Sequence, residues 1–219
     1  MKLSEGTRYL HAYGEDEVVI KKSRFIGRAW PVSSAEAAQR QIEVIKKEYW
    51  DATHNCYAYV IDERVRKCSD DGEPSRTAGM PIMDVITGRG LHHCLVIVTR
   101  YFGGILLGTG GLVTAYTTGT NIALDAAEIL TAYDGHEVDI HCNYEQYGRI
   151  NYLLQEADVL VSDTDFGVDI RLRAYIRKEL LAGIMRQVAE ATSGTVIPTV
   201  RRDLRFAVRN GEVILPDGK

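Results

Sequence analysis

A glycine-rich segment at residues 100–112 (RYFGGILLGTGGL) limits what this chain can fold into more than any other stretch. It directly follows the apolar run at residues 94–99, which has the composition of a buried strand. Glycine weakens helices and strands, so such density calls for positive φ angles, close main-chain packing or the close approach of a ligand. We therefore expect a tight connection from a strand to a helix, built on Gly103, Gly104, Gly108, Gly110 and Gly111.

Three acidic residues lie close together in a second unusual segment, residues 69–81 (SDDGEPSRTAGMP). Asp70, Asp71 and Glu73 carry the oxygen ligands that Mg²⁺ prefers, and carboxyl groups also serve in general acid–base catalysis. Acids in loops are usually solvated, however, and Asp71 followed by Gly72 is typical of a turn. The three acids are therefore weak candidates for a catalytic site, and no metal site is predicted.

The composition is that of an ordinary globular protein without a membrane segment. The 219 residues suffice for one large or two small domains, and 45% of them are hydrophobic and 26% charged. No run of about 18 apolar residues exists, and the N-terminal sequence lacks the apolar core of a signal peptide. The four cysteines form no CxxC pair, as expected for reduced thiols. We expect a cytoplasmic protein with no cofactor and no membrane contact.

Hydrophobic periodicity predicts an α+β domain in the first part of the chain. A capping box from Ser33 to Glu36 begins a helix whose apolar positions recur every three or four residues. Small residues line a long helix at about residues 112–130, which favours close packing against a sheet. Strands are expected at residues 17–20, 24–32, 56–61 and 94–99, and a short helix at residues 80–87.

The pattern restarts after a turn signal at residues 133–135, which we take as the boundary between domains at residues 1–134 and 135–219. Strands are expected at residues 136–142, 159–164, 168–174 and 195–200, and helices at residues 144–157 and 177–192. This β-α-β-β-α-β order is that of a ferredoxin-like fold, and a short tail is expected from residue 201 onward.

Backbone N–H groups of the glycine-rich segment would suit a phosphate, helped by the dipole of the following helix and by Arg100. The glycine pattern is neither a P-loop nor a dinucleotide fingerprint. The alternative is a tight connection that lets the following helix dock closely on a sheet. The sequence leaves both interpretations open.

Histidines and cysteines give a third candidate site. His54 and Cys56, together with His92, His93 and Cys94, would form a thiol or zinc site if they met on adjacent strands. Their spacing matches no zinc finger, and cysteines within apolar strands usually behave as small hydrophobic residues.

Basic and aromatic residues gather before the glycines and in the first expected hairpin, a combination used by proteins that bind single-stranded nucleic acid. Such basic residues are also typical of a solvated sheet edge. The net charge of −4 argues against nucleic acid coating the whole surface but leaves room for a local basic face. The residues of this candidate surface are Lys21, Lys22, Arg24, Arg28, Arg100, Tyr101 and Phe102.

Four segments resemble the IMPACT/YigZ family: KKSRFIGRAWPV from Lys21, DATHNCYAYVI from Asp51, SDDGEPSRTAGMPIMDVI from Ser69 and VTRYFGGILLGTGGLVTAY from Val98. They occur in order through the first expected domain, and the remainder is similar to the small C-terminal domain of bacterial YigZ-type proteins. The resemblance implies an N-terminal domain of the β-α kind shared by domain IV of translation GTPases and a small-subunit ribosomal protein. It implies a ferredoxin-like C-terminal domain similar to domain V of elongation factor G.

One position departs from the family's pattern. The family usually reads EPSGTAG, and this chain has Arg76 in place of the glycine. If the position needs a positive φ angle, arginine costs about 1 kcal/mol or more there. If the loop is mobile, Arg76 instead adds a contact to phosphate.

Together these observations predict a non-enzymatic cytoplasmic protein that contacts RNA, the ribosome or translation factors and regulates translation. Two other classes remain open: an enzyme that uses Mg²⁺ and the acidic residues on a phosphorylated substrate, and a pure protein-interaction module. The residues expected to contact nucleic acid or another anion are Arg24, Arg76, Arg100, Tyr101, Gly103, Gly104, Gly108 and Gly110.

Overall fold

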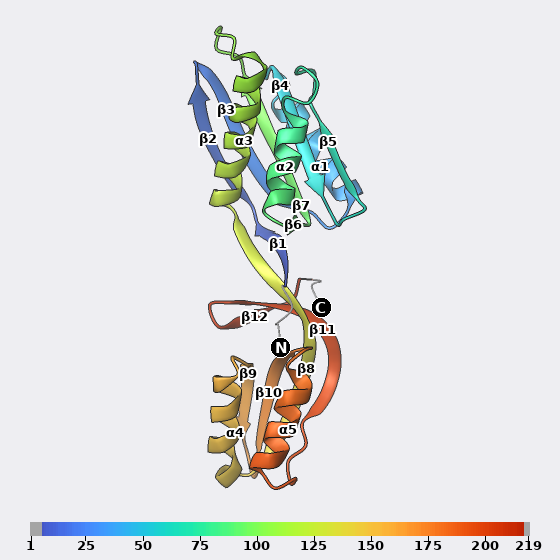
Figure 1. Cartoon of the computed structure of the whole chain (residues 1–219), viewed down its shortest axis with the longest axis vertical. Coiled ribbons are helices and arrows are strands. Elements are labelled where there is room, and N and C mark those ends of the chain that lie inside the picture. Colours follow the sequence, from blue (N-terminus) through green and yellow to red (C-terminus); the bar gives the residue numbers. More distant parts are fainter. Residues whose placement is uncertain (1–5, 217–219) are drawn as a thin grey trace. The chain divides into compact units, whose positions relative to one another are not determined.

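The computed structural model describes residues 6–216, and the chain divides into two compact units (Figure 1). One unit consists of residues 7–130, and the other begins at residue 131 and includes Gly6. Each unit mixes helices with β-sheet, so the α+β class predicted from the sequence is confirmed. None of the helices within residues 6–216 is both long and apolar enough to cross a membrane.

An antiparallel sheet of five strands is the framework of the 7–130 unit, in the order β2-β3-β7-β4-β5. Its strands are β2 (Gly14–Ile20), β3 (Ser23–Pro31), β4 (His54–Val60), β5 (Arg66–Ser69) and β7 (Cys94–Tyr101). A short parallel pair, β1 (Thr7–Ala12) and β6 (Leu91–His92), belongs to the same unit.

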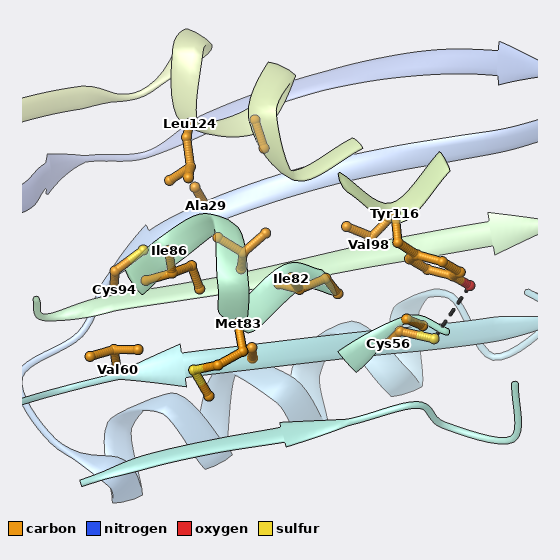
Figure 2. Packing of buried hydrophobic residues seen from close by; sticks show 14 of the residues in the cluster. Ala29, Cys56, Val60, Ile82, Met83, Ile86, Cys94, Val98, Tyr116 and Leu124 are labelled. Carbon is orange, nitrogen blue, oxygen red and sulfur yellow. Dashed lines mark hydrogen bonds between the residues drawn. The ribbon is translucent and has the colours of Figure 1, made fainter. Parts of the chain in front are cut away.

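Helices cover both faces of this sheet. On one face α1 (Ala35–Glu48) packs its apolar stripe, including Ile42 and Ile45, against β4 and β7. On the other face lie α2 (Gly79–Gly88) and α3 (Gly108–Ala126), whose buried side chains are shown in Figure 2. Gly27 of β3 faces the main chain of Gly119 in α3, so the small residues of this helix allow the close approach that the sequence predicted.

Two local expectations for this unit are wrong. Ser34, not Ser33, caps α1, because the Ser34 hydroxyl accepts the hydrogen bond from the backbone of Ala37 at 3.2 Å. Helix α3 begins at Gly108 rather than near residue 112, so three of the five glycines lie in its first turn. The buried residues of α3 begin at Leu112, so the packing of the later turns holds the helix, and its first turn of glycines stays open.

The second unit has the ferredoxin-like order β-α-β-β-α-β. Strand β8 pairs antiparallel with β10 on one side and with β11 on the other, and β9 extends the sheet beyond β10. The elements are β8 (Glu128–Cys142), α4 (Tyr144–Glu156), β9 (Leu160–Phe166), β10 (Ile170–Arg177), α5 (Leu181–Ala191), β11 (Thr199–Arg209) and β12 (Glu212–Ile214).

The predicted turn at residues 133–135 and the predicted tail from residue 201 are both wrong. Residues 133–135 continue β8, and Gly135 pairs with Arg177 on one side and Leu204 on the other. A β-carbon at Gly135 would crowd the carbonyl of Ile176 and the ring of Phe206, so this glycine serves close packing rather than a turn. The supposed tail forms most of β11 and all of β12.

Candidate functional site

The connections at one end of the 7–130 unit carry most residues that the sequence singled out. Arg24 of β3 lies opposite Tyr101 of β7, and His54 of β4 lies opposite Arg100. The ends of these three strands therefore coincide, and the segments attached to them gather there (Figure 1). We call this region the loop end, and it comprises residues 21–22, 49–53, 70–78 and 102–107.

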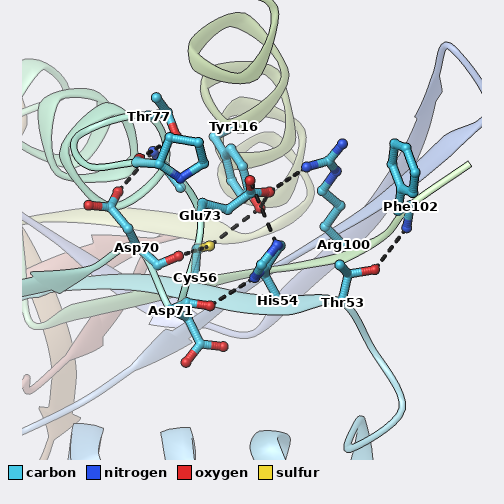
Figure 3. Close-up of polar contacts among 12 residues, drawn as sticks. Thr53, His54, Cys56, Asp70, Asp71, Glu73, Thr77, Arg100, Phe102 and Tyr116 are labelled. Atoms are coloured by element: carbon cyan, nitrogen blue, oxygen red, sulfur yellow. Dashed lines mark hydrogen bonds and ion pairs between the residues drawn. The ribbon is translucent and has the colours of Figure 1, made fainter. Parts of the chain in front are cut away.

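The acidic segment turns its central carboxylate into the protein. Glu73 is 8% exposed, and one oxygen accepts hydrogen bonds from Arg100 Nη1 at 2.6 Å and from the Tyr116 hydroxyl at 2.7 Å (Figure 3). His54 Nε2 lies 3.8 Å from the other oxygen, and His54 Nδ1 lies 2.8 Å from the carbonyl oxygen of Asp71. A buried carboxylate needs such partners, because an unpaired charge is costly away from water. Glu73 therefore ties the acidic segment to β4, β7 and α3.

Arg100 is the other half of this ion pair and is buried with it. Only 6% of its side chain is exposed, and its guanidinium lies 5.5 Å from the ring centre of Phe25 and 5.4 Å from that of Phe102. Its Nε is buried without a hydrogen-bond partner among residues 6–216. The expectation that Arg100 contacts a phosphate on a partner does not fit this position, because Glu73 and two rings already surround its charge.

Asp70 holds the acidic segment in shape. Its carboxylate accepts hydrogen bonds from the backbone N–H groups of Arg76, Ala78 and Gly79 at 2.8–3.0 Å, so it caps the start of α2 from eight or nine residues away. Burial acts to raise the pKa of Asp70, but the three backbone donors bring that pKa below its ordinary value. Asp70 is thus a structural carboxylate.

Asp71 also points to internal partners. It accepts a hydrogen bond from the backbone N–H of Asn55 at 2.7 Å and forms an ion pair with Lys46. The carboxylates of Asp70, Asp71 and Glu73 therefore face three different sets of donors. They do not converge on one point, which leaves the magnesium enzyme without support from this arrangement.

The predicted thiol or zinc site is not assembled. His54 and Cys56 lie near the start of β4, whereas Cys94 and the two histidines before it lie opposite Val60 or beyond, at the other end of that strand. Four to six residues of strand separate the two groups, a distance of about 13–20 Å. Burial raises the pKa of the Cys56 thiol, which disfavours the thiolate form that a nucleophile or a zinc ligand needs.

The glycines of the predicted surface divide into two kinds. Gly103 packs against the backbone of Lys22, where a β-carbon would overlap it, and its N–H donates to the Ser23 hydroxyl at 3.2 Å. Around the others, no neighbouring group among residues 6–216 lies within 4 Å of where a β-carbon would stand. These open glycines are Gly104, Gly108 and Gly110, and the first two have φ angles of +83° and +74°.

Two of the arginines expected at the surface have internal partners. Arg24 is half-exposed, and its Nε donates to Glu17 at 2.8 Å. Arg28 is only 2% exposed and donates to Glu15 at 2.9 Å, so the prediction that it belongs to a basic surface is wrong. Its place on a central strand beneath the end of α1 explains this burial.

Three basic residues at the loop end are exposed. Lys21 and Lys22 form the β2–β3 turn with φ angles of +46° and +65°, as in a two-residue hairpin of type I′. Arg76 has a φ angle of +64°, which answers the question raised by its replacement of the family's glycine. Within residues 6–216 none of the three side chains forms an ion pair or hydrogen bond. Their charges are free for a partner.

Aromatic and aliphatic side chains complete the loop end. Tyr101 donates its hydroxyl to Asp51 at 3.0 Å and is half-buried. Trp50 and Leu106 are 81% and 83% exposed, and the sequence reasoning singled out neither of them. Trp50 directly follows Tyr49, the last position of the α1 apolar stripe. Because neighbouring residues of a helix do not share a face, the sequence could have indicated that Trp50 is exposed to solvent.

Comparison with known proteins finds matches for both units. A family model described as the Impact N-terminal domain matches residues 21–124. A second family model, described as a domain of unknown function (DUF1949), matches residues 140–195. The loop end lies within the first of these two ranges.

Two bacterial proteins and one solved structure resemble most of the chain. The chain is 37% identical to IMPACT family member YvyE of Bacillus subtilis, over 84% of this chain and 89% of that protein. It is 36% identical to IMPACT family member YigZ of Escherichia coli, over 81% of this chain and 89% of that protein. A crystal structure titled as that of a hypothetical protein aligns with a TM-score of 0.55 and 33% identity, over 91% of this chain and 99% of the other.

Proposed function

This chain belongs to the IMPACT family, and from that premise we propose that it contacts RNA of the translation apparatus through the loop end. It acts in the cytoplasm as a non-enzymatic regulator of translation. Phosphates of the RNA meet Lys21, Lys22 and Arg76, and the open main chain of the glycine-rich segment approaches the backbone of the RNA.

The observation that carries the proposal is the pairing of open main chain with free lysines. Gly103 packs on Lys22, which brings the two-lysine turn beside the start of α3. Leu107, the residue before α3, has no side-chain oxygen to cap the N–H groups of the first turn. Gly108 and Gly110 leave these groups accessible, as donors for an anion require.

The local charge also supports a phosphate-bearing partner. The acids at or beside the loop end have partners inside the protein: Glu17, Asp71 and Glu73 form ion pairs with Arg24, Lys46 and Arg100, and Asp51 and Asp70 accept hydrogen bonds from neutral donors. Lys21, Lys22 and Arg76 form no ion pair among the described residues, so three positive charges stand against two negative ones that no cation balances, although the whole chain carries −4. Steering of a charged partner depends on this distribution rather than on the total.

Binding of a fluorescent single-stranded RNA of about 12 nucleotides, measured by anisotropy over a range of salt concentrations, tests the proposal. We expect affinity to fall as salt rises, with a slope of about −0.7 for each phosphate contacted. The double variant Lys21→Glu, Lys22→Glu should weaken binding at least tenfold. The control is Lys178→Glu, which reverses one exposed lysine in the other unit.

Purified small ribosomal subunits, tested in the same salt series, extend the assay to the translation apparatus. We expect the double variant to lose binding to these particles as well. An affinity indifferent to salt, or no binding at micromolar protein, would contradict the proposed function.

A further inference from the structure

One face of the five-stranded sheet is only partly covered by its helix. Residues 24, 26, 28 and 30 of β3 share this face because side chains alternate along a strand. Arg28 lies opposite Ile97 of β7, which packs with Ile42 of α1, so this is the α1 face. Helix α1 packs over β4 and β7, while Val19 of the edge strand β2 remains 64% exposed.

Aromatic side chains form a strip across this face, from the loop end to the far end of β3. Trp30 and Tyr13 contact each other with ring centres 5.2 Å apart. The guanidinium of Arg28 lies 4.0 Å from the ring centre of Tyr49. Tyr101 lies opposite Arg24 at the other end of the strip, about 20 Å away along the strand. We call Tyr13, Trp30, Tyr49 and Tyr101 the aromatic strip.

Every ring of the aromatic strip is at least partly open to solvent. Tyr13 is 46% exposed, and Trp30, Tyr49 and Tyr101 are partly exposed. Large rings that lie together and stay accessible are unusual on a sheet, where single exposed apolar residues are the rule.

The charges within the strip are balanced by pairing. Glu15 accepts from Arg28 at 2.9 Å, and Glu17 accepts from Arg24. The strip itself is therefore close to neutral, while the lysine turn at its end carries positive charge without an internal partner. A ligand that fits this pattern presents flat apolar faces in a row and negative charge at one end.

We propose that the aromatic strip binds single-stranded RNA, with unpaired bases stacked on its rings and the sugar–phosphate chain passing the Lys21–Lys22 turn. This inference rests on the proposed function and specifies the form of the RNA. Sheet faces with aromatic side chains stack bases in this way, and each stacked base contributes substantially to affinity. Paired bases of a duplex are buried in its own stack and offer no faces to the strip.

The tryptophans make the proposal directly measurable. The chain has two, of which Trp30 belongs to the strip, so the variant Trp50→Phe leaves Trp30 as the reporter. Titration of this variant with an oligouridylate of about 12 nucleotides should quench its tryptophan fluorescence, because bases stack on the indole. A blunt RNA duplex of the same length that binds only through phosphates should leave the fluorescence unchanged.

Single substitutions test the contribution of the strip to RNA binding separately from that of the Lys21–Lys22 turn. Tyr13→Ala removes a ring that is 46% exposed and lies beside Trp30, so folding is preserved, and it should weaken binding of the single strand about tenfold. The matched control is Tyr152→Ala, an exposed aromatic of α4 in the other unit, which should leave the affinity unchanged.

The outcomes distinguish the two proposals. Equal affinity for single strand and duplex, with wild-type binding by Tyr13→Ala and a loss in the Lys21→Glu, Lys22→Glu variant, overturns the strip and leaves the proposed function standing. Absence of binding to either RNA overturns both. Quenching of Trp30 by the single strand, together with weaker binding by Tyr13→Ala, supports the strip.

Discussion

The acidic segment and the glycine-rich segment lie at the same end of one unit, but they differ in exposure. The acidic segment buries its central carboxylate, whereas the glycine-rich segment exposes its central residues to solvent. Glu73 at the centre of the acidic segment is 8% exposed and has charged and hydroxyl partners. Leu106 in the glycine-rich segment is 83% exposed, and Gly104 beside it has no neighbour where a β-carbon would stand. The difference separates residues that hold the fold from residues that are free to meet a partner.

This comparison reverses the roles that residue type suggests. In the sequence, Arg100 and the three acids are typical of a catalytic or binding site. In the structure, their charged groups have partners within the protein. Of the groups left open, Lys21 and Lys22 were expected at a basic surface, whereas the sequence analysis did not single out Trp50. The buried charged residues at this end therefore stabilise the fold, and the RNA binding that we propose uses the exposed residues around them.

The largest expected effect comes from removing the inward carboxylate. Glu73→Ala leaves the Arg100 guanidinium buried without its counter-charge, and breaking such a buried pair costs about 3–5 kcal/mol of unfolding free energy. Urea denaturation of the wild type and the variant measures the loss. The control is Glu17→Ala, which breaks the half-exposed pair with Arg24 and should cost less than about 1 kcal/mol. Equal losses in the two variants would abolish the distinction between buried and exposed charge.

A smaller effect should separate the two kinds of glycine. Gly103→Ala places a methyl group against the backbone of Lys22 and should destabilise the protein by about 1–3 kcal/mol. Gly110→Ala enters open space in the first turn of α3 and should stabilise by about 0.5–1 kcal/mol. Thermal unfolding of both variants measures these changes. A change of stability in the same direction for both variants would show that the packed Gly103 and the open Gly110 do not differ in role. Gly110→Ala should also weaken RNA binding if the main chain there contacts the RNA.

The third effect is pH-dependent and concerns the cap on α2. Asp70→Ala removes the acceptor of three backbone N–H groups and should cost about 1–2 kcal/mol at neutral pH. Because the folded-state pKa of Asp70 is lowered, its stabilising effect is present above the unfolded value of about 3.9 and is lost as pH falls through the folded value.

Urea unfolding of wild type and Asp70→Asn between pH 7 and pH 3 checks this sign. We expect the advantage of the wild type over Asp70→Asn to be constant near neutral pH and to shrink once the pH drops below about 4. An advantage that grows on acidification would contradict the capping role.

The sequence predicted the fold well where its signals are local. The apolar runs that became β4 and β7 and the stripe of α1 follow from periodicity alone. Local signals misled where pairing with distant residues decided the structure. Asp134 and Gly135 are typical of a turn, but β11 pairs with both residues and β10 with Gly135, which keeps them in β8. The glycines at the start of α3 read as loop because tertiary packing is invisible to helix propensity.

The candidate site was harder to predict because its residues meet across long distances in the chain. Arg100 is 27 residues from Glu73, and Tyr116 is 43 residues from it, so no spacing rule indicates this cluster. The zinc hypothesis failed on strand direction, since antiparallel β4 and β7 carry His54 and Cys94 to opposite ends. Burial of Arg100 follows only from knowing which face of β7 the two helices cover.

The smallest expected effect tests whether Arg76 stabilises the fold or contacts the RNA. Its backbone is inward, because its N–H donates to Asp70 at 2.9 Å with a φ angle of +64°, while its side chain has no partner among residues 6–216. Arg76→Gly removes the strain of the left-handed conformation but adds freedom to the unfolded chain, so we expect a net stabilisation of about 0.5 kcal/mol. The same variant should weaken RNA binding and flatten its salt dependence by about one phosphate contact. Thermal unfolding and the anisotropy assay measure the two effects separately.

A loss of stability in Arg76→Gly would mean that the arginine side chain holds the acidic segment. An unchanged RNA affinity would remove Arg76 from the binding surface.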